Sequence, residues 1–241
     1  MAGTAKRFNR ILQNEIRIHA AWLPVTNAFQ VGDYGLISGG VFQKMGNIRE
    51  FAVDWLSEPG PPITLDFSSQ GTRMTRFVGD AEVQTLPDQG VDAKVEIIFE
   101  KEDSFLLKAR LNLDQMKNLA QVALALSRAS GWNKRYRVVN ASYTGQDCLI
   151  ISTREANSKV ELSGKANALK QLDLGAINVG VGIQSSKQLG LEIAGDSGVV
   201  GLGLFKLGRS GTPKILADAE TGEEVEIEVQ EDWDADPEDD I

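Results

Sequence analysis

The stretch Val91-Asp92-Ala93-Lys94-Val95-Glu96-Ile97 alternates apolar and charged side chains. This two-residue period is that of a β-strand with one face on a core and the other in water. The same alternation returns in Lys159–Leu162, Ile177–Ile183, Leu189–Ile193 and Gly201–Leu207. Repeated alternation of this kind is typical of antiparallel sheets, so the sequence predicts a protein built mainly on β-structure.

One helix is expected to divide these strands into two blocks. The first block runs from Ile63 to Arg110 and the second begins at Tyr136. Between them the spacing predicts a helix over residues 112–130, capped by Asn112 or Asp114 and stopped at Gly131. Its expected core stripe consists of residues at the 3/4 spacing: Leu113, Met116, Leu119, Ala120, Ala123 and Leu124.

Two further helices are predicted ahead of the first block. Residues 4–18 form a basic amphipathic pattern with Phe8 and Leu12 on one face. Residues 48–56 also have helical spacing and end at Glu58–Pro62. We therefore predict an α+β fold, in which residues 5–208 form a single domain with a mainly antiparallel twisted sheet and flanking helices, followed by an acidic C-terminal tail.

Charge is distributed unevenly along the chain. The whole chain has 34 acids and 25 bases, and its last residues, Asp218–Ile241, hold 13 of the acids and no base. The remainder therefore has 21 acids and 25 bases, a charge of +4 against −13 for the tail. Such asymmetry indicates either a solvated end or an internal mask over a basic surface.

The residue inventory contains little that catalysis needs. His19 is the only histidine and Cys148 the only cysteine, and both lie in apolar surroundings. A multi-histidine metal site and a cysteine-rich zinc site are therefore excluded, and from its apolar context we expect His19 to be structural rather than part of a triad. Ser163-Gly164-Lys165 lacks the rest of a phosphate loop. We expect no enzyme, no catalytic residue, no cofactor, no metal and, because bases and aromatics are not interleaved, no nucleic acid as partner.

Targeting segments are not evident. Lys6, Arg7 and Arg10 are not followed by an apolar run, so we expect no signal peptide. No stretch approaches the roughly 20 apolar residues of a membrane-spanning helix. The default expectation is a cytoplasmic protein.

The order of elements resembles the pore-forming domain of bacterial gasdermins. The resemblance is carried by Lys134–Val139, Leu149–Ser152, Val160–Leu162, Asn178–Val181 and Gly201–Leu207, and loosely spans residues 5–208. It implies residues 1–208 as a gasdermin-like pore-forming domain and residues 209–241 as an autoinhibitory acidic segment. It further implies a soluble precursor that oligomerises on a membrane and inserts β-hairpins, killing the cell in an antiphage-type defence.

Partners and location follow from the same resemblance. They are an anionic lipid membrane, other copies of the chain when active, and an activating protease. The inactive protein is expected in the cytoplasm and the active one at the inner membrane.

Three groups of residues are candidates for this function. The membrane contact is expected at the basic N-terminal residues Lys6, Arg7, Arg10 and Arg17. The inserting strands are expected around Val91, Val95, Ile97, Val179, Val181, Ile183, Leu202 and Leu204. The autoinhibitory contacts are expected at Val225, Ile227, Val229 and Trp233.

Two other functions remain open on the sequence. The first is a non-membrane α+β interaction module with an acidic regulatory tail, because soluble antiparallel sheets alternate for the same reason as pore strands. The second is a nucleic-acid mimic, in which the tail binds a basic partner and is released by salt.

Overall fold

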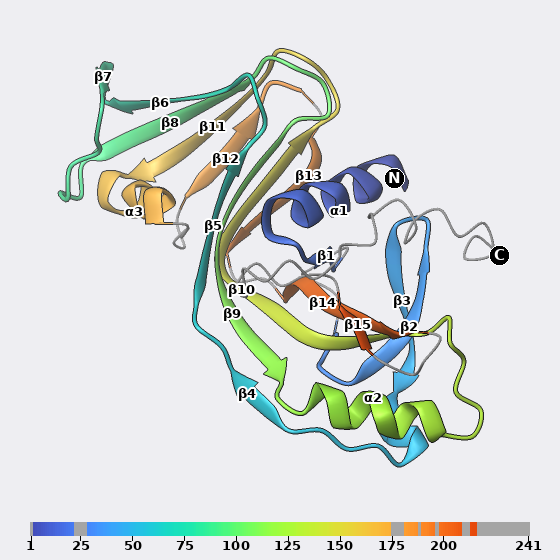
Figure 1. Ribbon diagram of the computed structural model, residues 1–241. Helices are drawn as coiled ribbons and strands as arrows, with labels where there is room; N and C mark the ends of the chain where they lie inside the picture. The colour runs from blue at the N-terminus through green and yellow to red at the C-terminus, as the bar shows by residue number, and fades with distance from the viewer. Residues whose placement is uncertain are drawn as a thin grey trace. The chain divides into compact units, whose positions relative to one another are not determined.

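Alternation in the opening stretch becomes strand β8, Asp92–Phe99 (Figure 1). This strand buries Ala93, Val95, Ile97 and Phe99 and turns the intervening side chains outward. The computed structural model describes residues 2–21, 28–174, 181–187, 189–195, 198–208 and 213–215. The chain divides into two compact units, the first from Met1–Pro61, Asn112–Thr144 and Gly198–Ile241, the second from Pro62–Leu111 and Gly145–Ser197.

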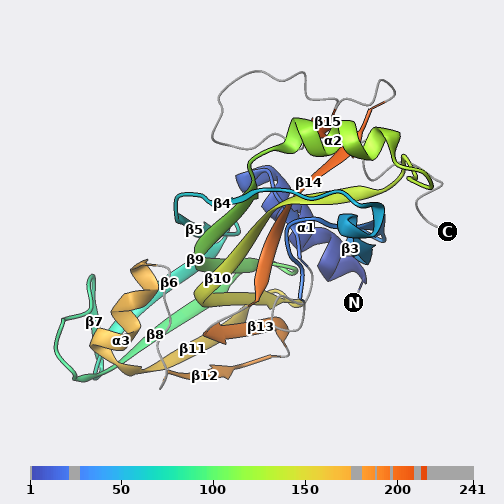
Figure 2. The same ribbon diagram turned by 90° about the horizontal axis from the view of Figure 1, so that it is seen from below.

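The second unit contains a five-stranded antiparallel sheet. Its strand order is β12-β11-β8-β6-β7, and the strands lie side by side in Figures 1 and 2. Their bounds are β6 Thr72–Val78, β7 Ala81–Val83, β11 Ser158–Lys165 and β12 Gly182–Ser185. The connection from β11 to β12 contains helix α3, Ala166–Lys170, and a 3-10 helix, Gln171–Leu174.

Two longer strands run through both units. They are β9, Phe105–Met116, and β10, Arg137–Thr153. In the second unit, β9 pairs with β5, Ile63–Ser68, from Leu106 to Leu111, and β10 pairs with β13, Leu189–Gly195. These pairings, too, are antiparallel.

The first unit is organised around β14, Val199–Leu207. One edge of β14 pairs with β10, and the other edge pairs with β1, His19–Ala20, and with β15, Pro213–Ile215. The remaining strands of this unit are β2 Asp33–Ser38, β3 Val41–Asn47 and β4 Ser57–Pro59. Its apolar cores gather around Val138 and Phe205 and around Leu202 and Leu204.

The N-terminal amphipathic helix is confirmed. Helix α1, Ala2–Ile16, buries Phe8 and Leu12. Its polar side chains fasten it to β1, since Asn9 Oδ1 accepts a hydrogen bond from the Ala20 amide at 2.8 Å and Gln13 Nε2 lies 3.5 Å from His19 Nδ1.

The predicted helix over residues 112–130 is wrong in its first part. Helix α2 covers only Leu119–Arg128, while Leu113 and Met116 belong to β9. The buried stripe of α2 is Val122, Ala123 and Leu126, and the predicted core residues Ala120 and Leu124 are exposed. Residues 114–116 pair with β4, a contact between segments far apart in sequence that local spacing does not reveal.

The helix predicted over residues 48–56 is also shorter than expected. Only Ile48–Phe51 form a 3-10 turn, capped by Asn47, whose Oδ1 accepts from the Arg49 amide at 3.2 Å. Ala52 then adopts φ 56, a left-handed conformation that ends the helix. The α+β class with mainly antiparallel sheets is confirmed. The acidic tail lies outside the described residues.

Candidate functional site

Two hairpin segments lie next to each other in the five-stranded sheet. Residues 72–99 carry β6, β7 and β8, and residues 158–185 carry β11, α3, the 3-10 helix and β12. Each segment is 28 residues long. The segments meet where β8 pairs with β11 over its whole length, from Ser158 opposite Phe99 to Lys165 opposite Asp92.

One face of this sheet is apolar. The buried side chains of β8 and β11 pack in one cluster with Leu86, with Ala166 and Leu169 of α3, and with Leu172 of the 3-10 helix. Met74, Val78, Val83, Val181 and Ile183 are partly buried against the same cluster. Within the second unit, therefore, apolar surface of the two segments is covered by α3 and its continuation, and also by Leu106 of β9 and by Leu149 and Ile151 of β10.

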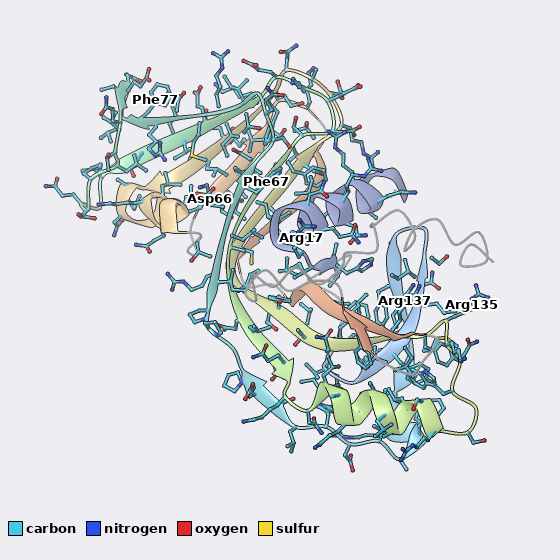
Figure 3. All side chains as sticks on the ribbon, in the orientation of Figure 1. Arg17, Asp66, Phe67, Phe77, Arg135 and Arg137 are labelled. Atoms are coloured by element: carbon cyan, nitrogen blue, oxygen red, sulfur yellow. The ribbon has the colours of Figure 1, made fainter. Side chains whose placement is uncertain are left out.

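The opposite face is charged. Glu96 Oε1 lies 3.0 Å from Lys94 Nζ and 2.8 Å from Lys159 Nζ, so one carboxylate joins β8 to β11. Lys94 Nζ also lies 3.9 Å from Glu161 and 4.8 Å from the ring centroid of Phe77, which Figure 3 labels on β6. Lys165 forms a further pair with Asp92 at 2.7 Å.

The alternation of β11 continues into helix α3. Along β11 the buried side chains are Ser158, Val160 and Leu162. Beyond Leu162, every second residue is small and uncharged: Gly164, Ala166 and Ala168. Lys165 and Asn167 lie between them. The start of α3 therefore has a sequence that also fits an extended strand with one apolar face.

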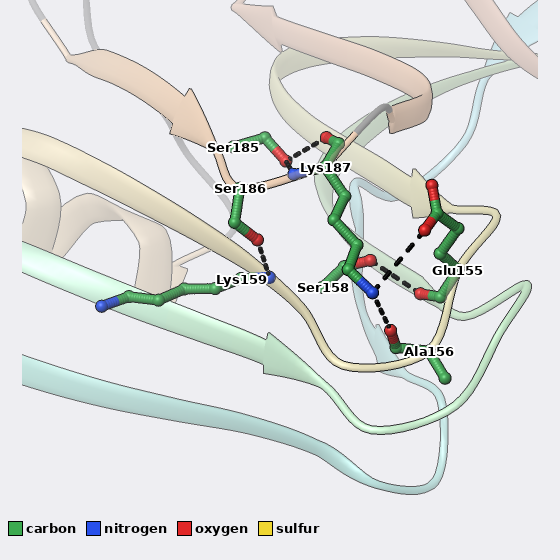
Figure 4. A network of polar contacts seen from close by, with 7 residues as sticks. All are labelled: Glu155, Ala156, Ser158, Lys159, Ser185, Ser186 and Lys187. Atoms are coloured by element: carbon green, nitrogen blue, oxygen red, sulfur yellow. Dashed lines mark hydrogen bonds and ion pairs between the residues drawn. The ribbon is translucent and has the colours of Figure 1, made fainter.

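A polar network closes the end of the second hairpin (Figure 4). Lys187 Nζ donates to the Ala156 carbonyl at 2.7 Å and lies 3.6 Å from Glu155. Ser186 Oγ accepts from the Lys159 amide at 2.9 Å. These contacts fix the open end of the hairpin, where β11 begins and β12 ends.

Most of the predicted inserting residues come together in this sheet. Val95 and Ile97 lie on the apolar side of β8, Val91 directly precedes that strand in the same alternation, and Val181 and Ile183 pack against the same core. Leu202 and Leu204 are instead buried in the first unit, on β14. Val179 lies outside the described residues.

Strand β6 was missed by sequence reasoning. Its register places Arg73, Thr75 and Phe77 on the charged face and Met74 and Val78 on the apolar face. Arg76 shares the apolar side and breaks the pattern. The alternation is present, but a charged residue among the apolar positions hides it.

The predicted basic contact lies on α1. Lys6, Arg7 and Arg10 are exposed on the side of the helix opposite Phe8 and Leu12. Arg17 follows the helix with φ 59 and is half-buried (Figure 3). The helix thus presents three cations outward while its apolar face is docked.

His19 is fully buried in β1. Burial, and secondarily the positive charge of Arg137, lower its pKa from 6.5 to about 4. The imidazole is therefore neutral near pH 7. This histidine has no carboxylate or thiol partner in the contacts described for it, and its surroundings are those of a structural residue.

Only the beginning of the C-terminal segment is described. Strand β15 pairs Ile215 with Phe205 and Pro213 with Leu207, along the same edge of β14 that β1 occupies further on. Val225, Ile227, Val229 and Trp233 lie outside the described residues.

Other site types find no support in the part of the chain that is described. No helix there is both long enough and apolar enough to cross a bilayer. No group of three or more His, Cys, Asp or Glu side chains is arranged there to hold a metal ion.

Comparison with known proteins gives only distant structural likeness. No protein-family model and no curated protein matches the chain. Among solved structures, it is similar to the gasdermin A3 membrane pore determined by cryo-EM, with 10% identical residues, a TM-score of 0.33, and coverage of 88% of this chain and 93% of that chain. Because the likeness is distant, a functional assignment has to rest on the geometry of the two hairpin segments.

Proposed function

We propose that this protein forms pores in anionic membranes. Copies of the chain assemble on the membrane, and each inserts residues 72–99 and 158–185 as two hairpins. The observation that carries the proposal is that these two segments are equal in length, adjacent in one antiparallel sheet, and apolar on one face and charged on the other.

The length of the segments suits a bilayer crossing. A membrane strand needs about 9–11 residues. A hairpin of 28 residues, less a turn of about four, leaves about 12 residues for each of its strands. Residues 91–99 alone supply five apolar side chains to one face, at Val91, Ala93, Val95, Ile97 and Phe99.

The two faces then have separate environments. In a spanning strand, apolar side chains meet lipid and polar ones face the water-filled interior. The cluster around Val95 and Val160 would meet lipid, and the pairs around Glu96 would line the interior. Lysine or arginine on the lipid face would cost about 2–4 kcal/mol at mid-depth.

Insertion requires that the apolar face be uncovered first. Val160 and Leu162 are fully buried, and α3 packs on the same core. We propose that α3 leaves this core and extends β11 as a strand, using the alternation through Ala166 and Ala168. Backbone groups of α3 would then exchange helical hydrogen bonds for ladder bonds, so none is left unpaired in lipid.

The C-terminal segment supplies the restraint in this proposal. Residues 209–241 carry 13 acids and two bases, a charge of −11 against +2 on the rest of the chain, and β15 attaches this segment to the edge of β14 shared with β1. Removal of the segment by a protease would leave Lys6, Arg7 and Arg10 to anionic lipid, at about 1 kcal/mol for each base. The resemblance to bacterial gasdermins extends the proposal to defence, in which the permeabilised cell dies.

Neighbouring substitutions on opposite faces test the insertion. Val91 is 37% exposed and continues the apolar side of β8 towards the turn of the first hairpin. Gly90 is its exposed neighbour, where an added Cβ atom would have no other atom within 4 Å and the backbone φ is not positive. Val91→Lys should reduce dye release from anionic vesicles at least roughly tenfold, since about 2–4 kcal/mol recurs in every copy.

Gly90→Lys is the matched control and should leave dye release near that of the unaltered protein, because its charge would face the interior. Both variants should keep the circular dichroism and unfolding midpoint of the unaltered chain. Equal release by the two variants would show that this strand does not enter lipid with its apolar face.

A further inference from the structure

Resting on the pore proposed above, we infer that its interior carries almost no net charge, so that anions and cations of similar size pass nearly equally. The charged face of the five-stranded sheet supplies this property. The ion selectivity of the pore would be set by four acids and four bases on this face. The acids are Glu82, Asp92, Glu96 and Glu161, and the bases are Arg73, Lys94, Lys159 and Lys165.

Register assigns these eight residues to one side of the sheet. Glu82 stands opposite Phe77, Phe77 opposite Lys94, and Lys94 opposite Ser163. These residues therefore form one row across β7, β6, β8 and β11. Glu96 stands opposite both Thr75 and Glu161, one row away on the same face. In a sheet, residues that stand opposite each other project to the same side.

The charges are also paired locally. Glu96 contacts Lys94 and Lys159, and Asp92 contacts Lys165. Each contact joins neighbouring strands, or residues two apart on one strand. Such contacts are kept when a sheet lengthens without changing register. Alternating signs at such short spacing cancel within a Debye length, about 8 Å at physiological salt.

The balance extends to the hairpin segments as a whole. Residues 72–99 and 158–185 together contain six bases and seven acids. The face that would line the interior is therefore unlike the tail, where 13 acids occur with no base. Rings of one sign are what make a channel prefer one kind of ion, and this face does not provide them.

Ion permeability in planar bilayers tests the inference. The full chain, cut at a protease site engineered after Gly208, is added to a bilayer of phosphatidylcholine with phosphatidylglycerol under a potassium chloride gradient. Dilute salt is used, because the Debye length rises to about 30 Å at 0.01 M and fixed charges then act across a wide pore. The unaltered protein should show a potassium-to-chloride permeability ratio between roughly 0.5 and 2.

Two matched double variants change the balance in opposite directions. Asp92→Asn with Glu161→Gln removes two acids from β8 and β11, and Lys159→Gln with Lys165→Gln removes two bases from β11. The first should shift the ratio towards chloride and the second towards potassium, each by roughly threefold or more. Circular dichroism of each variant confirms that the sheet is retained.

The permeability ratios and the presence of conductance decide whether the inference holds. Opposite shifts from a nearly non-selective parent support the inference. A conducting parent that is strongly selective, or two variants that conduct without any shift, would overturn the inference while leaving the pore intact. Absence of any conductance from the cut protein would overturn the pore and the inference together.

Discussion

At the scale of single residues, His19 makes the stability of the first unit sensitive to pH. Its Nε2 has no hydrogen-bond partner among the described residues, and its pKa is lowered to about 4 by burial and by Arg137. In the unfolded chain the same imidazole takes up a proton near pH 6.5. Between those values the unfolded state binds more protons, so stability falls as the pH falls.

The expected loss is about 3 kcal/mol between roughly pH 6.5 and 4. Denaturant unfolding at a series of pH values measures it. His19→Gln removes the titrating group and should flatten the profile in this window, after the contribution of carboxylates common to both proteins is subtracted. Parallel profiles for the two proteins would show that His19 is charged in the folded state.

At the scale of elements, helix α2 provides a test of which residues form its core. Leu126 is fully buried and Leu124 is 50% exposed, although they are only two positions apart. Leu126→Ala should lower the free energy of unfolding by about 2–5 kcal/mol. Leu124→Ala is the control, and surface changes of this kind are usually within about 0.5 kcal/mol. Equal effects in denaturant titrations would contradict the observed packing, in which the face with Leu126 is buried and the face with Leu124 is exposed.

Local pattern was sufficient for some elements and not for others. The alternation in β8 and β11 and the apolar face of α1 are determined within a few residues, so the sequence predicts them correctly. Leu113 and Met116 fit a helix by spacing as well as a strand, and pairing with β4 decides between the two. Such pairing joins distant segments and leaves no local trace.

The candidate site shows the same division. Val91, Val95 and Ile97 could be found from alternation alone. Their adjacency to β11 depends on sheet order, and the identity of their cover, α3, depends on packing. Arg76 hides the period of β6, so the first hairpin could not be outlined from its sequence.

At the scale of the whole molecule, the central claim is that residues 72–99 and 158–185 enter the membrane. The charge asymmetry sets the conditions for observing it, because the tail carries −13 and the remainder +4. Salt screens exposed charges, so binding should weaken as ionic strength rises. Anionic vesicles in moderate salt are therefore the appropriate target, with vesicles of phosphatidylcholine alone as the control.

Dye release from vesicles of phosphatidylcholine with phosphatidylglycerol is the most direct measurement. The full chain carrying a protease site after Gly208 is added before and after cutting. The cut protein should release the dye, the uncut protein should release much less, and phosphatidylcholine vesicles should remain sealed. If neither form releases dye from anionic vesicles, although both remain folded, the protein does not form pores and the hairpin segments do not insert.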